Sequence, residues 1–168
     1  KEYNDDDSPQ QREATLREMM KNRMSNAEIS NIRIENVTEL DKPFIYAFHI
    51  KVPGYAQRTG KRLFLQPGFF QHGIRAPFQT SQRKYAVYFH YPWAEEDVVI
   101  IDLPAGYALD NADQPAPFNI DKIGAYDVKI GITSDGQTLE YKRKFFFGGQ
   151  NRILFPPATY PTLKQVFD

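Results

Sequence analysis

The hydrophobic pattern of the chain changes from a helical period to a strand period near residue 26. Ser8 is a suitable N-cap, Pro9 suits the first helical position, and Gln11 completes a Ser-x-x-Gln capping box. The following apolar residues recur at helical spacing, as Leu16, Met19, Met20 and Met24. We therefore expect a helix over about residues 9–24, with this stripe in contact with the core.

From about residue 27 onward, apolar and polar residues alternate with the period of two that is typical of strands. Residues 42–52 predict a long strand. Five of its apolar side chains share one face, namely Phe44, Tyr46, Phe48, Ile50 and Val52. The run 61–66 predicts a shorter strand, and the Gly- and Pro-containing segment 66–82 predicts a long irregular connection.

The second half of the chain predicts further strands. Residues 85–91 alternate, with Tyr85, Val87, Phe89 and Tyr91 on one face. Residues 97–103 form a nearly continuous β-branched run, which predicts a central strand buried on both faces and adjacent to 85–91. Residues 124–147 predict a hairpin whose turn is Asp135-Gly136, because the glycine accepts a positive φ.

One helix followed by about seven to eight strands favours a mainly β fold, an antiparallel β-sandwich with an N-terminal α-helix. We treat residues 1–7 as a polar linker stub and 8–168 as one domain that ends in a short helix or tail. The pattern leaves open whether the N-terminal helix packs on its own sandwich.

Composition narrows the function classes. The chain has 168 residues, 21 basic and 21 acidic, which argues against nucleic-acid binding through net charge. It contains no Cys, which excludes thiol nucleophiles, thiolate metal sites and disulfides. No apolar run approaches the ~20 residues of a membrane span.

No group of residues has the spacing of a catalytic or metal site. His49, His72 and His90 lack a second ligand at metal-binding spacing, so we expect neither a metal nor another cofactor. The acidic triplet 95–97 is expected to be a solvated turn. Arg143 alternates with aromatic residues, and we expect it to be buried and paired with a carboxylate.

Three aromatic residues are candidates for ligand binding, because they lie near predicted strand ends: Tyr91, Trp93 and Tyr107. Exposed rings at such positions can stack on a sugar. The plainer interpretation of Trp93, which follows Pro92 in a predicted loop, is a ring that caps one end of the sandwich.

Several phrases occur in a familiar order: QREATLREMMKNR, Arg83 to Tyr91-Pro92, Leu103-Pro104-x-Gly106-Tyr107, Tyr141-Lys142-Arg143 and the closing YPTLKQV. Over most of residues 9–168 the chain resembles the C-terminal domain of bacterial transglutaminase-like proteins. In these proteins a β-sandwich of unknown function follows a papain-like core. The resemblance transfers no catalytic residue, because the Cys, His and Asp of that family belong to the core.

The resemblance implies a non-catalytic accessory domain whose partner is the transglutaminase-like core of the same chain. It also implies a periplasmic or secreted location, since such proteins are commonly exported by Gram-negative bacteria. A carbohydrate- or peptide-binding module is the alternative, and a self-contained hydrolase is the third hypothesis.

Overall fold

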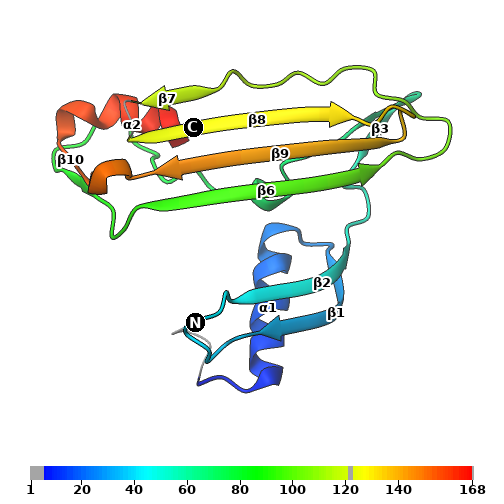
Figure 1. Cartoon of the computed structure of the whole chain (residues 1–168), viewed down its shortest axis with the longest axis horizontal. Coiled ribbons are helices and arrows are strands. Elements are labelled where there is room, and N and C mark those ends of the chain that lie inside the picture. The colour runs from blue at the N-terminus through cyan, green and yellow to red at the C-terminus, as the bar shows by residue number, and fades with distance from the viewer. Residues whose placement is uncertain (1–5, 121–122, 168) are drawn as a thin grey trace. The chain divides into compact units, whose positions relative to one another are not determined.

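The computed structural model describes residues 6–120 and 123–167 (Figure 1). They form a mainly β fold with ten strands in antiparallel sheets, a helix near the N-terminus and a short helix near the C-terminus. The predicted fold class is confirmed. There are more strands than the predicted seven to eight because several of them are only two or three residues long. Most of the predicted linker stub 1–7 lies outside the described residues.

The chain divides into two compact units, and we describe each by itself. The first unit comprises Lys1–Gln66 with His72–Ile74, and the second comprises Pro67–Gln71 with Arg75–Asp168. Our sequence prediction placed residues 8–168 in one domain. None of the helices in the described ranges is long and apolar enough to cross a membrane.

Helix α1, Pro9–Arg23, begins with the predicted capping box. The Ser8 hydroxyl accepts a hydrogen bond from the Gln11 backbone N–H at 3.2 Å, and the Gln11 side chain accepts one from the Ser8 N–H at 2.8 Å. Three apolar side chains at i, i+4 spacing are buried, namely Leu16, Met20 and Met24. Met19 was wrongly assigned to this stripe: it is 44% exposed, because the buried stripe is only one residue wide.

Strands β1, Glu28–Glu35, and β2, Ile45–Lys51, form an antiparallel ribbon in contact with α1. The ladder is irregular between Ser30 and Arg33. The predicted single apolar face of β2 is wrong in its first half, where Tyr46 is exposed and Ile45 is half-buried. The extra residue lies in β1, opposite Phe48 of β2, and a bulge of this kind bends the ribbon locally.

A small hairpin follows in the same unit. Strand β3, Gln57–Thr59, pairs with β4, Arg62–Phe64, around Gly60, whose φ is +61°. Strand β4 was predicted, whereas β3 was missed because its residues are all polar.

The second unit is built on a four-stranded sheet in the order β6-β9-β8-β7 (Figure 1). Its strands are β6, Trp93–Asp102; β7, Phe118–Ile120; β8, Gly124–Ile132; and β9, Thr138–Phe147. The β8–β9 hairpin and its Gly136 turn, with φ +71°, are as predicted. The segment 97–103 is not a central strand: β6 is at the edge, and its Val98 and Ile100 are 50% and 64% exposed.

The segment 85–91 is also not a strand beside β6. Only Val87–Tyr88 form a strand, β5, and this pairs with β10, Leu154–Phe155. Tyr85 is 83% exposed, although it was assigned to a core face. The residues between Val87 and Trp93 turn the chain away from the sheet, so the β5–β10 pair forms a separate ribbon.

An aromatic cluster packs this ribbon and helix α2, Tyr160–Phe167, on one face of the sheet, which gives the unit its sandwich-like layering. The cluster consists of Phe78, Val87, Phe145, Phe147, Phe155, Tyr160 and Leu163. Short 3₁₀ turns complete the connections at Phe69–Gln71, Gly149–Asn151 and Pro157–Thr159. Of the predicted terminal helix or tail the structure contains the helix, and the predicted irregular connection 66–82 is also observed.

Candidate functional site

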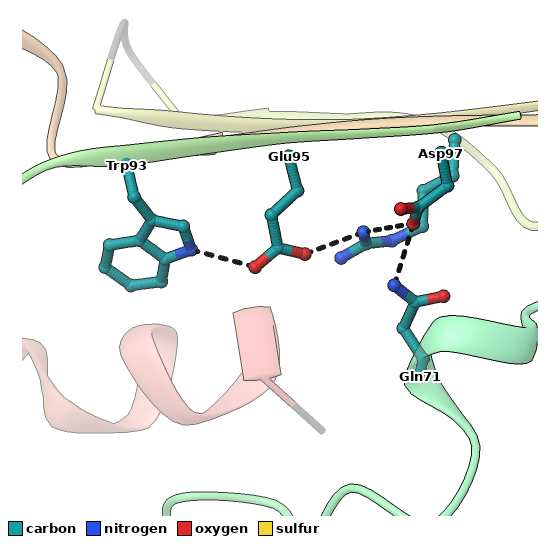
Figure 2. Close-up of polar contacts among 5 residues, drawn as sticks. Gln71, Trp93, Glu95 and Asp97 are labelled. Atoms are coloured by element: carbon teal, nitrogen blue, oxygen red, sulfur yellow. Dashed lines mark hydrogen bonds and ion pairs between the residues drawn. The ribbon is translucent and has the colours of Figure 1, made fainter. Parts of the chain in front are cut away.

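The inner face of β6 carries a row of polar side chains (Figure 2). Every second residue of a strand points to the same side, which brings Trp93, Glu95 and Asp97 into one line. The Trp93 Nε1–H donates a hydrogen bond to Glu95 Oε1 at 3.1 Å. The acidic triplet is therefore part of a strand and not the predicted solvated turn; Glu96 alone faces the other side, where it pairs with Lys144 at 3.0 Å.

Arg143 joins two of these carboxylates. Its Nη1 donates to Glu95 Oε2 at 2.8 Å and to Asp97 Oδ2 at 2.9 Å. The Arg143 side chain is only 10% exposed, so the predicted buried pairing is confirmed. Burial opposes its charge, but hydrogen bonds and the charges of the two carboxylates outweigh burial and raise the pKa of Arg143 above its ordinary value.

Gln71 completes the row from the 3₁₀ turn Phe69–Gln71 (Figure 2). Its Nε2 donates to Asp97 Oδ2 at 2.8 Å, while its Oε1 is buried and accepts no hydrogen bond from the described residues. The sequence contains no signal for this contact, because Gln71 lies in an irregular segment 26 residues away from Asp97.

Tyr141 lies on the same face of β9 as Arg143. Burial raises the pKa of Tyr141 to about 12, and the neighbouring Tyr126, which is hydrogen-bonded to it, adds to the effect. The Tyr141 side chain therefore remains a neutral hydrogen-bonding group well above ordinary pH.

The charges of the row do not cancel. Glu95 and Asp97 supply two negative charges and Arg143 one positive charge, so the three together carry one excess negative charge. Asp97 is 13% exposed and Glu95 is 43% exposed. The excess charge is thus accessible to solvent mainly at Glu95.

Glu95 also lies at one edge of a surface groove with a volume of about 540 Å³. We call this the Tyr88–Glu95 groove, and its lining residues are Tyr88, Phe89, His90, Tyr91, Trp93 and Glu95. Tyr88 and Tyr91 are 58% and 68% exposed. The groove therefore combines accessible phenol rings with a partly exposed carboxylate.

Trp93 has a different role from the two tyrosines. Its ring centroid lies 5.1 Å from that of Phe147 and 6.0 Å from that of Phe167, with which it stacks. It is half-buried and forms the first residue of β6, not the exposed loop ring that one interpretation of the sequence required. Trp93 thus belongs both to the aromatic cluster and to the wall of the groove.

The structure brings Tyr91 and Trp93 together but places Tyr107 elsewhere. Tyr107 closes a turn with Pro104, whose carbonyl accepts its N–H at 3.0 Å, and Gly106 in this turn has a φ of +82°. This turn follows the opposite end of β6, about 30 Å along a strand of this length. The three candidate residues do not form one site.

The histidines occupy separate places. His49 contacts Asn31 at 3.0 Å on the β1–β2 ribbon, and His72 contacts Gln66 at 3.2 Å. His90 lines the groove, with its ring 5.4 Å from that of Tyr88. Within the described ranges, no three His, Cys, Asp or Glu side chains are grouped so as to hold a metal ion.

These features define a class of protein: a mainly β domain that carries a polar network on the covered face of its sheet and an aromatic groove beside it. A family model described as a domain of unknown function with solved structure, DUF3858, matches residues 61–168. This is well over half of the chain, and the chain therefore belongs to that family. No curated protein and no solved structure matches it.

Proposed function

We propose that this chain is a non-catalytic interaction domain from the C-terminal end of a transglutaminase-like, periplasmic or secreted protein. The observation that carries the proposal is that the clustered carboxylates of β6 are paired with a buried arginine. Glu95 and Asp97 both accept hydrogen bonds from one buried Arg143, which holds them as parts of the sheet's packing. Removal of one partner from such a pair leaves an uncompensated charge, so the pairing gives both carboxylates a structural role.

The family match supports this proposal at the level of organisation. Its first matched residue, residue 61, lies close to the start of the second compact unit at Pro67. The matched part therefore corresponds to a unit with its own sheet and aromatic cluster, as expected for a module attached to a larger protein. The link to a transglutaminase-like core rests on the resemblance of the sequence phrases.

The proposal is tested by separating the core from the domain. The gene's full reading frame identifies the preceding region, which we expect to encode a core with Cys, His and Asp. The core alone, this chain alone and the joined protein are then assayed for amide hydrolysis and acyl transfer. We expect turnover by the core and the joined protein, and none by this chain; turnover by this chain alone would show that it is an enzyme.

A ligand-binding module is the second candidate function, and the Tyr88–Glu95 groove favours it. Exposed aromatic side chains with a few polar groups in a concave site are typical of ligand-binding surfaces. The single Trp of the chain, Trp93, lines the groove, so its fluorescence reports on binding there. A shift on titration with glycans or peptides supports this candidate, and no response across both classes counts against it.

A further inference from the structure

We infer that the Tyr88–Glu95 groove binds an organic cation, the ammonium or guanidinium group of a Lys or Arg side chain on a peptide partner. The inference rests on the second candidate function above, and it names the ligand class. Three properties of the groove lead to it: its exposed rings, its charge, and the rigid attachment of its carboxylate.

The rings provide the first property. The face of an aromatic ring carries negative electrostatic potential and attracts a cation placed above it. Tyr88 and Tyr91 are the most exposed rings of the groove, at 58% and 68%. Trp93 is held from behind by Phe147 and Phe167, so the groove wall does not need to be ordered when a ligand enters.

The charge of the groove is the second property. Among its lining residues Glu95 is the only one with a carboxylate, and none is a Lys or Arg. The guanidinium of Arg143 is shared between Glu95 and Asp97, and these three groups together carry one excess negative charge. A cation gains from this imbalance, whereas no Lys or Arg among the lining residues is present to attract an anion.

The carboxylate itself is preorganised, which is the third property. Glu95 Oε1 accepts from the Trp93 indole at 3.1 Å and Oε2 accepts from Arg143 at 2.8 Å. These bonds fix the direction of the carboxylate, yet its side chain remains 43% exposed. Each carboxylate oxygen can accept more than one hydrogen bond, so an ammonium or guanidinium donor can still bind it.

A neutral glycan would use the same rings but not the excess charge. Sugars stack their C–H faces on aromatic rings and form hydrogen bonds with polar groups. A neutral sugar gains nothing from the excess negative charge of the site. The groove favours a cation because aromatic rings and a carboxylate attract it at the same place. The two ligand classes are therefore separated by the effect of removing one negative charge.

The experiment uses NMR on the whole 168-residue chain, in which Trp93 provides the only indole N–H signal. The probes are the Nα-acetyl methylamides of lysine, arginine and norleucine, and a cello- and a chito-oligosaccharide. We expect saturable indole shifts with the lysine and arginine probes and none with norleucine, which has a similar length but no charge. A response only to saccharides, or no response to any probe at its solubility limit, would overturn the inference.

Two variants test whether the lysine and arginine probes bind in the groove. Glu95→Gln keeps an acceptor for Trp93 but removes the charge, and we expect binding to weaken about fivefold, as for loss of a partly exposed ion pair. Tyr91→Ala, at a position that is 68% exposed, should weaken binding about threefold through the lost ring. Because Tyr91 is so exposed, this second variant remains informative if Glu95→Gln disturbs the fold.

Matched controls lie close by in the sequence. Glu96→Gln removes the same charge from the opposite face of β6, and Tyr85→Ala removes an 83% exposed ring that does not line the groove. Both should bind the lysine probe like the unmodified chain. Equal weakening by Glu95→Gln and Glu96→Gln would mean general charge attraction and would refute a site in the groove.

Saccharide binding that depends on Tyr91 would refute the cation site and leave the ligand-binding function standing. Neither result bears on the accessory role, which the separate assay of the core decides.

Discussion

At the scale of single residues, Arg143 is a buried charge in the second unit. It lies on an otherwise apolar face of β9, between Tyr141 and Phe145, both of which are buried. A charge at such a position is tolerated only when opposite charges and hydrogen bonds replace water. Glu95 and Asp97 supply them from the next strand, because Asp97 is the direct register partner of Arg143.

Replacement of Arg143 by Met should destabilise the protein strongly. The substitution keeps apolar volume but leaves the carboxylate of Asp97, 13% exposed, without its cation. Loss of one partner of a buried ion pair predicts a decrease of about 3 kcal/mol in the free energy of unfolding. Urea denaturation monitored by circular dichroism measures it.

The neighbouring Lys144→Met is the control for this prediction. Lys144 forms an exposed pair with Glu96, and its loss should change the free energy of unfolding by less than about 0.5 kcal/mol. Adding Glu95→Gln and Asp97→Asn to Arg143→Met should recover part of the lost stability. Equal effects of the Arg143 and Lys144 substitutions would contradict the role assigned to burial.

The raised pKa of Tyr141 predicts a loss of stability at alkaline pH. Burial raises its pKa from 10.0 to about 12, so between these values the folded protein holds a proton that the unfolded chain has lost. The free energy of unfolding should therefore fall as the pH rises from 10 towards 12. Below pH 10 the stabilisation that arises from the raised pKa of Tyr141 should be fully present.

Tyr141→Phe removes this titration. Its stability should fall less steeply than that of the unmodified chain over the same pH range, as measured by urea denaturation. Absorbance of tyrosinate should also show one fewer late-titrating phenol in the folded variant. Identical pH profiles for the two chains would show that Tyr141 ionises normally.

At the scale of elements, β6 shows how strand identity and strand position have different origins. Its β-branched run predicts a strand, and the structure contains one over Trp93–Asp102. Its place at the sheet edge follows from pairing with β9, which lies about 40 residues later and has β8 on its other side. Exposed Val98 and Ile100 are consistent with the high strand preference of such residues on either face.

The end of β9 provides a test of close backbone packing. Gly148 has a φ of +84°, and a Cβ atom added there would lie 2.7 Å from Pro92 Cβ, just before β6 begins. Gly148→Ala combines backbone strain with this collision and should cost about 3 kcal/mol of unfolding free energy. Thermal and urea denaturation measure the effect.

Gly136→Ala is the matched control, because Gly136 has a φ of +71° with no atom within 4 Å of an added Cβ. It should cost only the strain of the left-handed conformation, about 1 kcal/mol. The difference between the two variants isolates the contact with Pro92. If Gly148→Ala were no more harmful than Gly136→Ala, that contact would not constrain the fold.

At the scale of the whole molecule, the chain consists of two compact units, and each contains buried apolar residues. The first buries the stripe Leu16, Met20 and Met24 of α1, and the second buries the aromatic cluster around Phe147. The family match covers the second unit and ends where the chain ends, at residue 168. The second unit therefore has its own source of hydrophobic stabilisation.

A chain shortened to residues 61–168 should fold without the first unit. We expect a cooperative urea transition and a near-ultraviolet circular dichroism signal from the packed rings, since these rings belong to one unit. Phe147→Ala in the shortened chain should remove much of that signal, because Phe147 is 2% exposed. A shortened chain without a cooperative transition would show that the second unit depends on the first.

The sequence by itself determined the local features. The capping box of α1, the β8–β9 hairpin with its Gly136 turn and the burial of Arg143 were all predicted correctly. Caps, turns and alternation depend on residues a few positions apart, so their physical causes are readable along the chain.

Only the tertiary structure decided how distant segments meet. It placed β6 at an edge, brought Gln71 to Asp97, and joined Tyr91 and Trp93 in a groove that excludes Tyr107. Strand order and side-chain contacts of this kind depend on the packing energy of the whole unit, and a short stretch of sequence satisfies many alternatives equally well.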